Sequence, residues 1–188
     1  ALTGHFVLSS LHAVDAVSAV HRFTDMGIEP FLVASAISGV VGQRLLRRTC
    51  DECRTEFEPS PDHIKLVLAN HGAVPDTWTR GAGCNVCSGT GYAGRVGVYE
   101  LLQVSDEIRD EIVAKATARE IRTTAMRQGM RTMQQEAFRL VHEGVTTVDD
   151  VLRSVYAPGM DTEEEDVTEP VEALVGLRSL DTGERSTA

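Results

Sequence analysis

Long hydrophobic runs are missing from this chain of 188 residues. A membrane-spanning helix needs about 20 consecutive, mostly apolar residues. The longest apolar-rich stretch, PFLVASAISGVVGQRLL, is interrupted by serine and glycine, which favours a buried helix that leads into a strand. The opening residues ALTGHFVLSS also lack the basic region of a secretory signal peptide. We therefore expect a cytoplasmic location.

Basic side chains are scarce as well, with two lysines and sixteen arginines against 28 acidic residues and a net charge of −10. Residues 157–188 hold nine acidic side chains and two arginines. This balance argues against a nucleic-acid-binding protein, which usually presents a basic surface. The acidic segment has no aromatic residue, so we expect residues 157–188 to be a disordered tail.

The sequence lacks the loop G-x-x-x-x-G-K-[ST] that cradles nucleotide phosphates, because neither Lys65 nor Lys115 ends a glycine-rich loop. One string, GTGYAG, fits the dinucleotide fingerprint G-x-G-x-x-G letter by letter. That fingerprint needs a strand before it and a helix after it, whereas this string follows a cysteine pair and precedes a strand-like segment. We do not expect it to bind a cofactor.

Cysteine is restricted to two Cys-x-x-Cys pairs, CDEC at Cys50 and Cys53 and CNVC at Cys84 and Cys87. Each such turn directs two sulfurs at one point, and two turns complete the tetrahedral shell of a structural zinc ion. The second pair is surrounded by glycines that suit tight turns, namely Gly81, Gly83, Gly89 and Gly91. The spacing predicts a closed, structural Zn²⁺ site with four thiolate ligands.

Other roles for the thiols remain open. Reduced cysteines that bind no metal would show the same sequence pattern, and structural disulfides are disfavoured in a reducing compartment. A thioredoxin-like redox role is disfavoured because neither pair opens a helix after a strand. His63 and His71 lie between the pairs and could substitute as ligands, but we expect them to be surface or helix-capping residues.

Periodicity and capping residues predict the remaining elements. Phe6, Val7 and Leu8 indicate a buried strand that ends in polar residues. Strand-forming residues recur in GRVGVYELLQV. Helices are expected from Asp15 to Gly27, from Pro30, from Ser60 and Pro61, from Ser105, from the capping box of Thr117 and Glu120, from Thr132, and over TTVDDVLRSV.

Three stretches together carry a family resemblance: TGHFVLSSLHAVDAVSAVHRFTDMGIEPFLVASAISGVVGQRLLRRTC, GCNVCSGTGYAGRVGVYELLQV and EGVTTVDDVLRSV. Over residues 1–156 the chain resembles the C-terminal part of the ATPases of type II secretion and type IV pilus assembly. The resemblance implies an α/β fold that holds the C-terminal portion of a RecA-like P-loop NTPase core at 1–49. A tetracysteine zinc subdomain at 50–94 and a strand plus a C-terminal helical bundle at 95–156 would follow.

Such ATPases work as homohexamers that use ATP and Mg²⁺ to drive an inner-membrane platform protein, which implies a place at the cytoplasmic face of that membrane. The four cysteines favour a secretion or assembly motor over a retraction motor, and the resemblance does not separate secretion from pilus assembly. Because the phosphate loop is missing and the chain opens at Ala1, we expect a piece of a longer motor that serves in coupling. The alternative is a stand-alone, zinc-stapled binding module that docks on such a complex without hydrolysing nucleotide.

The resemblance also implies candidate nucleotide-sensing residues. GHFVLSSLH matches the family's histidine box, in which His12 and, at the other end of the strand, His5 would lie near the nucleotide. Arg44 matches a recurrent arginine that would face the nucleotide or a neighbouring subunit, with a surface salt bridge as the alternative. The family's usual Thr-Asn after the box is Ala-Val here, which removes polar contacts beside His12. Solvated side chains are expected at Arg47 and Arg48, and solvated or helix-capping side chains at His21 and His142.

Overall fold

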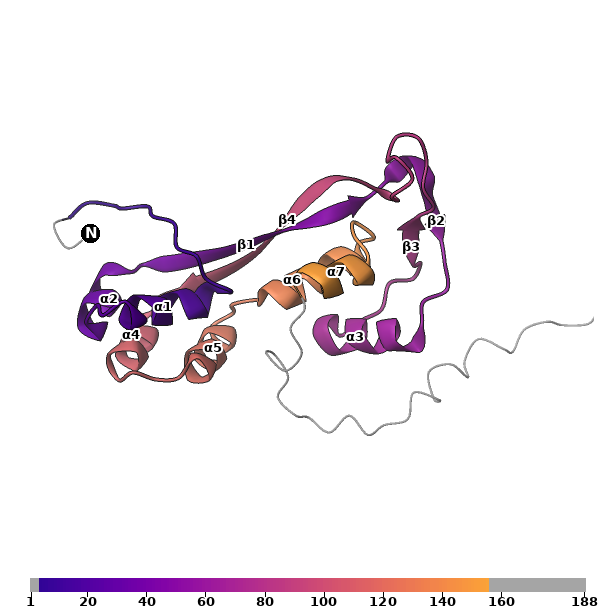
Figure 1. Ribbon diagram of the computed structural model, residues 1–188. Coiled ribbons are helices and arrows are strands. Elements are labelled where there is room, and N and C mark those ends of the chain that lie inside the picture. The colour runs from indigo at the N-terminus through magenta and orange to yellow at the C-terminus, as the bar shows by residue number, and fades with distance from the viewer. Residues whose placement is uncertain (1–3, 156–188) are drawn as a thin grey trace, which may run out of the picture. The chain divides into compact units, whose positions relative to one another are not determined.

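The computed structural model describes residues 4–155, which form an α/β arrangement (Figure 1). None of the described helices combines the length and apolar character needed to cross a membrane. In chain order the elements are α1 (Ala16–Asp25), α2 (Pro30–Ala36), β1 (Gly39–Thr49), the short 3-10 helix η1 (Asp51–Cys53), β2 (Arg54–Glu56), α3 (Pro61–His71), β3 (Thr79–Gly81), β4 (Tyr92–Gln103), α4 (Asp106–Val113), α5 (Ala118–Arg127), α6 (Met133–His142) and α7 (Val148–Ser154).

A long two-stranded ribbon is formed by β1 and β4, which pair antiparallel from Gly39 opposite Gln103 to Thr49 opposite Tyr92 (Figure 1). Successive side chains of a strand point to opposite faces. The inner face is buried against helices and holds Leu46, Val98, Glu100 and Leu102. The outer face stays open to solvent although it is apolar, and it holds Val41, Leu45, Tyr99 and Leu101.

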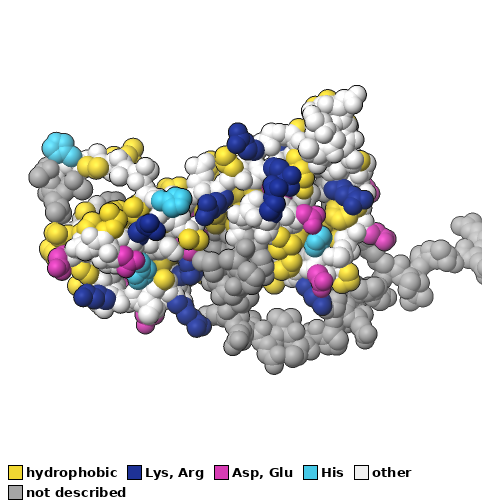
Figure 2. Space-filling view, viewed as in Figure 1, with side chains coloured by type: hydrophobic (Ala, Val, Ile, Leu, Met, Phe, Trp, Pro, Cys, Tyr) yellow, Lys and Arg dark blue, Asp and Glu magenta, His cyan; other side chains and the backbone are white. Residues whose placement is uncertain are grey.

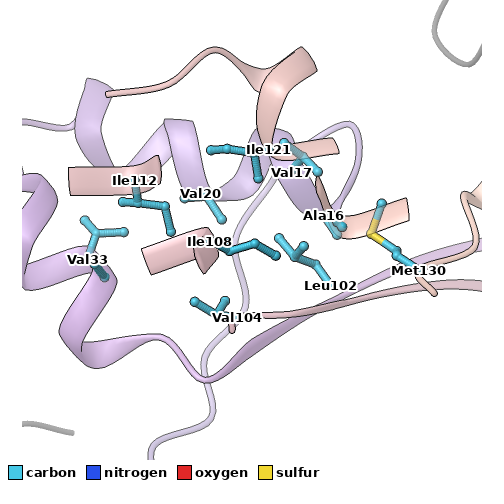
Figure 3. Close-up of a cluster of buried hydrophobic side chains, with 12 residues drawn as sticks. Ala16, Val17, Val20, Val33, Leu102, Val104, Ile108, Ile112, Ile121 and Met130 are labelled. Carbon is cyan, nitrogen blue, oxygen red and sulfur yellow. The ribbon is translucent and has the colours of Figure 1, made fainter. Parts of the chain in front are cut away.

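The ribbon contributes to two hydrophobic cores. The first gathers α1, α2, α4 and α5 around the end of β4, where Leu102, Ile108 and Ile121 point toward one another (Figure 3). The second packs α6 and α7 against the ribbon, and α3 contributes Val67; Phe138 is fully buried in it. Because both strands run through both cores, the ribbon connects the two sets of helices.

Most helix boundaries follow the predicted capping residues. The Asp15 side chain accepts a hydrogen bond from the Ser18 amide at the start of α1, and Gly27, with φ of +83°, lies just past its end. Ser60 caps α3 in the same way. The boxes at Thr117 and Thr132 are both formed, with the cap side chain and the side chain three residues on bonding reciprocally.

One element prediction is wrong. Residues 5–13 form no strand, and the side chains of Phe6 and Leu8 are 84% exposed. A strand needs a neighbour to receive its backbone hydrogen bonds, and within residues 4–155 β1 pairs with β4 and β2 with β3. The helix predicted from Pro30 is formed, ends at Ala36 and leads into β1.

Surface hydrophobic side chains are interspersed with arginine and lysine on the face shown in Figure 2. The exposed apolar residues include the outer ribbon face, where the exposed fractions run from 50% for Leu45 to 63% for Val41. Apolar side chains that gather on one exposed face, unlike single scattered ones, are typical of a surface that contacts other protein. The acidic tail predicted at 157–188 lies outside the described residues.

Candidate metal centre

The two cysteine pairs meet where the ribbon reaches the small sheet. Cys50 directly follows β1 and Cys53 ends η1, whereas Cys84 and Cys87 lie in the turn after β3. Backbone hydrogen bonds hold the two segments together: the Cys50 amide donates to the Gly91 carbonyl at 2.9 Å, and the Ala82 amide donates to the Cys53 carbonyl at 2.8 Å. These bonds tie the segment of the first cysteine pair to the residues that flank the second pair.

The four sulfurs form one compact cluster, in which all Sγ atoms lie within 4.8 Å of one another. The separations are 3.9 Å for Cys50–Cys84, 3.8 Å for Cys53–Cys87 and 3.7 Å for Cys84–Cys87. A tetrahedral site with zinc–sulfur bonds of about 2.3 Å places its sulfurs about 3.8 Å apart. The cysteines are free thiols, which leaves all four available as ligands.

Backbone amides point at two of the sulfurs. Gly83 donates to the Cys53 sulfur at 3.2 Å, and Cys84 and Gly91 donate to the Cys87 sulfur at 3.2 and 3.3 Å. The Cys84 amide, together with that of Gly91, lowers the pKa of the Cys87 thiol to about 6. Burial raises the pKa of the Cys53 thiol to about 12, and hydrogen bonds among the neighbouring thiols add to this effect. A bound cation would favour the thiolate form of every member of the cluster.

Glycine is required around the second pair for two different reasons. Gly83, Gly89 and Gly91 have φ values of +97°, +77° and +78°, which L side chains rarely adopt. Gly81 has no such angle, but a Cβ atom there would overlap the backbone of Gly91. The chain segments on either side of the second cysteine pair thus approach more closely than any side chain would allow.

The histidines between the pairs lie away from the sulfurs. Both His63 and His71 belong to α3, and the cluster of potential ligands found in residues 4–155 contains neither. The Nε2 atom of His63 lies 3.7 Å from a carboxylate oxygen of Asp149. The His71 ring lies 4.6 Å from the ring of His142, and burial together with His142 lowers the pKa of His71. Their expected role outside the metal site agrees with this geometry.

A buried ion pair supports the ribbon beside the cluster and was missed in the sequence. The Asp150 carboxylate of α7 accepts hydrogen bonds from the Arg47 amide and from its Nε atom, both at 2.6 Å. The Arg47 guanidinium stacks on the Tyr92 ring at 3.9 Å, and the Tyr92 hydroxyl bonds Thr147 at 2.6 Å. The prediction that Arg47 is solvated is therefore wrong, because β1 turns this side chain toward α7. Arg48 is exposed, as predicted, and pairs with Asp51.

The candidate nucleotide-sensing residues lie outside the thiol cluster. His5 and His12 are exposed in the segment that precedes α1. Arg44 is exposed on β1, and its guanidinium donates to the Val14 carbonyl at 3.4 Å. The fold thus brings Arg44 to a backbone position two residues beyond His12.

The chain is similar in sequence to known proteins. Residues 1–153 match the family described as Type II/IV secretion system protein. The chain is 42% identical over 153 residues to the type IV pilus assembly ATPase PilB of Thermus thermophilus, a match that covers 81% of this chain and 17% of that protein. It is 42% identical over 152 residues to the type II secretion system protein HxcR of Pseudomonas aeruginosa, with 81% and 29% covered.

The type II secretion system ATPase E of Vibrio cholerae is 36% identical over 152 residues, which cover 81% of this chain and 30% of that protein. The chain therefore spans less than a third of the length of these relatives. Because the matched residues 1–153 cover nearly the whole described region, including the four cysteines, the chain belongs to the type II/IV secretion system protein family.

Proposed function

We propose that this chain is part of a hexameric ATPase that powers type II secretion or type IV pilus assembly, and that it transmits motion within that motor. Relatives named as ATPases of both systems support this proposal. The sequence contains no G-x-x-x-x-G-K-[ST] loop, so the phosphate-cradling part of the reaction would come from elsewhere in the motor. ATP and Mg²⁺ would bind there.

The thiol cluster would hold a structural Zn²⁺ ion. The fit rests on the donor set and on three sulfur separations of 3.7 to 3.9 Å, close to those of a tetrahedral thiolate shell, with all four sulfurs within 4.8 Å of one another. A site closed by four protein ligands has no position for water, so the ion would supply a rigid crosslink. The ion would then join the segment after β1, with Cys50 and Cys53, to the turn after β3, with Cys84 and Cys87.

The contacts around the cluster support a role in transmission. Asp150 holds α7 to β1 through Arg47, and Gln134 of α6 donates to Asn70 of α3 at 2.8 Å. The metal subdomain at 50–94 is therefore connected to the C-terminal helices from two sides, through the ribbon and through α3. A displacement of the ribbon would move all of these parts together.

Two apolar surfaces would pack against the rest of the motor. One is the outer ribbon face with Val41, Leu45, Tyr99 and Leu101, and the other is the exposed segment Phe6–Leu8. In a RecA-like core that includes residues 1–49, this segment would find the neighbouring strand that it lacks in residues 4–155. His12 and His5 would then lie near the nucleotide, with Arg44 beside them. The moving parts would act on an inner-membrane platform protein at the cytoplasmic face.

The experiment that tests coupling uses the intact motor protein that contains this segment, with Cys84 and Cys87 both changed to serine. We expect the purified variant to keep nucleotide hydrolysis while secretion or pilus extension is lost in cells. Equal loss of hydrolysis and transport would contradict a coupling role, because the metal subdomain would then be needed for catalysis itself. Unchanged transport would contradict it as well.

A further inference from the structure

One buried carboxylate joins the two hydrophobic cores. Glu100 lies on the inner face of β4 with 3% of its surface exposed. One of its carboxylate oxygens accepts a hydrogen bond from the Ala16 amide at 2.9 Å, and the other accepts from the Met133 amide at 2.9 Å. Ala16 is the first residue of α1 in the first core, and Met133 is the first residue of α6 in the second.

Neither of these two amides is paired by the cap of its own helix. Asp15 caps α1 through the Ser18 amide, and Thr132 caps α6 through the Gln135 amide, so neither cap reaches the first residue of its helix. A helix N-terminus carries partial positive charge that favours a nearby carboxylate. Glu100 therefore interacts favourably with both helices at once.

The opposite strand lies against this contact. Gly42 of β1 pairs with Glu100, and a Cβ atom at Gly42 would come within 3.1 Å of the end of the Met133 side chain and 3.5 Å of the Ala16 amide nitrogen. Gly42 therefore lies directly beside both helix starts, and a methyl group there would require the Met133 side chain to shift slightly. Burial raises the pKa of Glu100, which agrees with a carboxylate that is removed from water.

We propose that Glu100 is a positioning residue that fixes the first core relative to the second, so that α1 and α6 shift and open together. The segment with His5 and His12 leads directly into α1, and α6 packs on α3 of the metal subdomain. Glu100 therefore links the segment that carries His5 and His12, through α1, to the metal subdomain, through α6. Without its two hydrogen bonds, the ribbon and the chain segment between α5 and α6, which carries Met130 of the first core, would connect the cores.

The test is urea unfolding of this chain, followed by two signals. Trp78, the single tryptophan, packs against the second core, and its fluorescence reports that core. Circular dichroism reports the helices of both cores. In the unchanged chain we expect coincident midpoints. In Glu100→Gln the side-chain NH₂ group faces a backbone N–H, so one of the two hydrogen bonds is lost and the cores unfold separately. We therefore expect the helix signal to be lost in two steps, the first before the Trp78 fluorescence changes.

The matched control is Glu120→Gln, which also changes a glutamate at a helix N-terminus. Glu120 is exposed and accepts a hydrogen bond from the Thr117 amide within the capping box of α5, a helix that packs in the first core only. We expect its two signals to stay coincident. If Glu100→Gln also shows coincident midpoints, shifted or not, then Glu100 does not join the cores and the proposal is overturned.

Hydrogen exchange of the unchanged chain decides the matter even if Glu100→Gln fails to fold. We expect peptides from α1 and α6 to be deprotected through one shared opening, with the same dependence on urea. In a folded Glu100→Gln variant, exchange in α1 should rise about ten-fold or more relative to α6, since a lost buried hydrogen bond is worth about 1.4 kcal/mol or more. Separate openings of α1 and α6 in the unchanged chain would overturn the proposal.

Discussion

The ion pair between Arg47 and Asp150 allows a sharp test of how α7 is held on the ribbon. The Asp150 side chain is fully buried and lies in the first turn of α7. It accepts two hydrogen bonds from Arg47 and one from Arg153 at 3.1 Å. The change Asp150→Ala removes all of these acceptors and leaves the Arg47 amide and guanidinium without their partner. We therefore expect a large loss of stability.

The magnitude follows from the burial of the two partners. Removing one member of a buried ion pair costs about 3 to 5 kcal/mol. The Arg47 side chain is 36% exposed, so water can solvate it in the variant, and we take the lower limit of about 3 kcal/mol. For a domain of this size that loss lowers Tm by about 6 to 12 °C. The assay is thermal unfolding followed by circular dichroism, in identical zinc-containing buffer.

The matched control is Glu107→Ala. Glu107 also accepts hydrogen bonds from two side chains, Arg127 at 2.5 Å and Gln128 at 2.9 Å, but its side chain is 51% exposed. Exposed ion pairs contribute little because water replaces them. A much smaller fall in Tm is expected for this variant. Equal falls in Tm for Asp150→Ala and Glu107→Ala would refute the reasoning that burial makes the Asp150 contact strong.

Two further predictions concern the metal subdomain and α3. Gly81→Ala should lower zinc affinity strongly, because its Cβ atom would overlap the backbone of Gly91. The control Gly94→Ala has open space around the new methyl group; its φ of +77° should lower the free energy of unfolding by about 1 kcal/mol and leave zinc affinity unchanged. Competition with a zinc chelator measures the zinc affinity of both variants, and equal affinities would contradict the close-approach argument. The pKa of His71 in the folded chain lies below its ordinary value of 6.5, so folding favours the neutral ring. The stability that this ring contributes is therefore lost as the pH falls from the pKa of the unfolded chain, about 6.5, toward the lower pKa of the folded chain. An NMR titration should show His71 below about 6.5, and its pKa should rise in His142→Ala; titration at or above 6.5 would contradict the burial of this ring.

Local chemistry explains which parts of the fold could be predicted from the sequence. Helix starts at Ser60, Thr117 and Thr132 depend on side chains within three residues of the cap, so the sequence pattern was sufficient. The thiol cluster could be predicted because two Cys-x-x-Cys turns specify a ligand set whatever the length of chain between them. Both features are encoded in short segments.

The features that were missed depend on distant partners. The segment Phe6–Leu8 has the composition of a strand, but a strand forms only beside a neighbour, which residues 4–155 do not supply. Arg47 was predicted as solvated because its partner Asp150 lies 103 residues away. Glu100 did leave a signal: it occupies the inward row of β4 between Val98 and Leu102, where a charge requires a specific partner.

The most direct test of the proposed metal centre is X-ray absorption at the zinc edge, together with metal analysis, on this chain purified without chelators. The account predicts one zinc ion per chain with four sulfur neighbours at about 2.3 Å. A correctly folded sample with little zinc, or with zinc bound by nitrogen or oxygen in place of the sulfurs of Cys50, Cys53, Cys84 and Cys87, would contradict it.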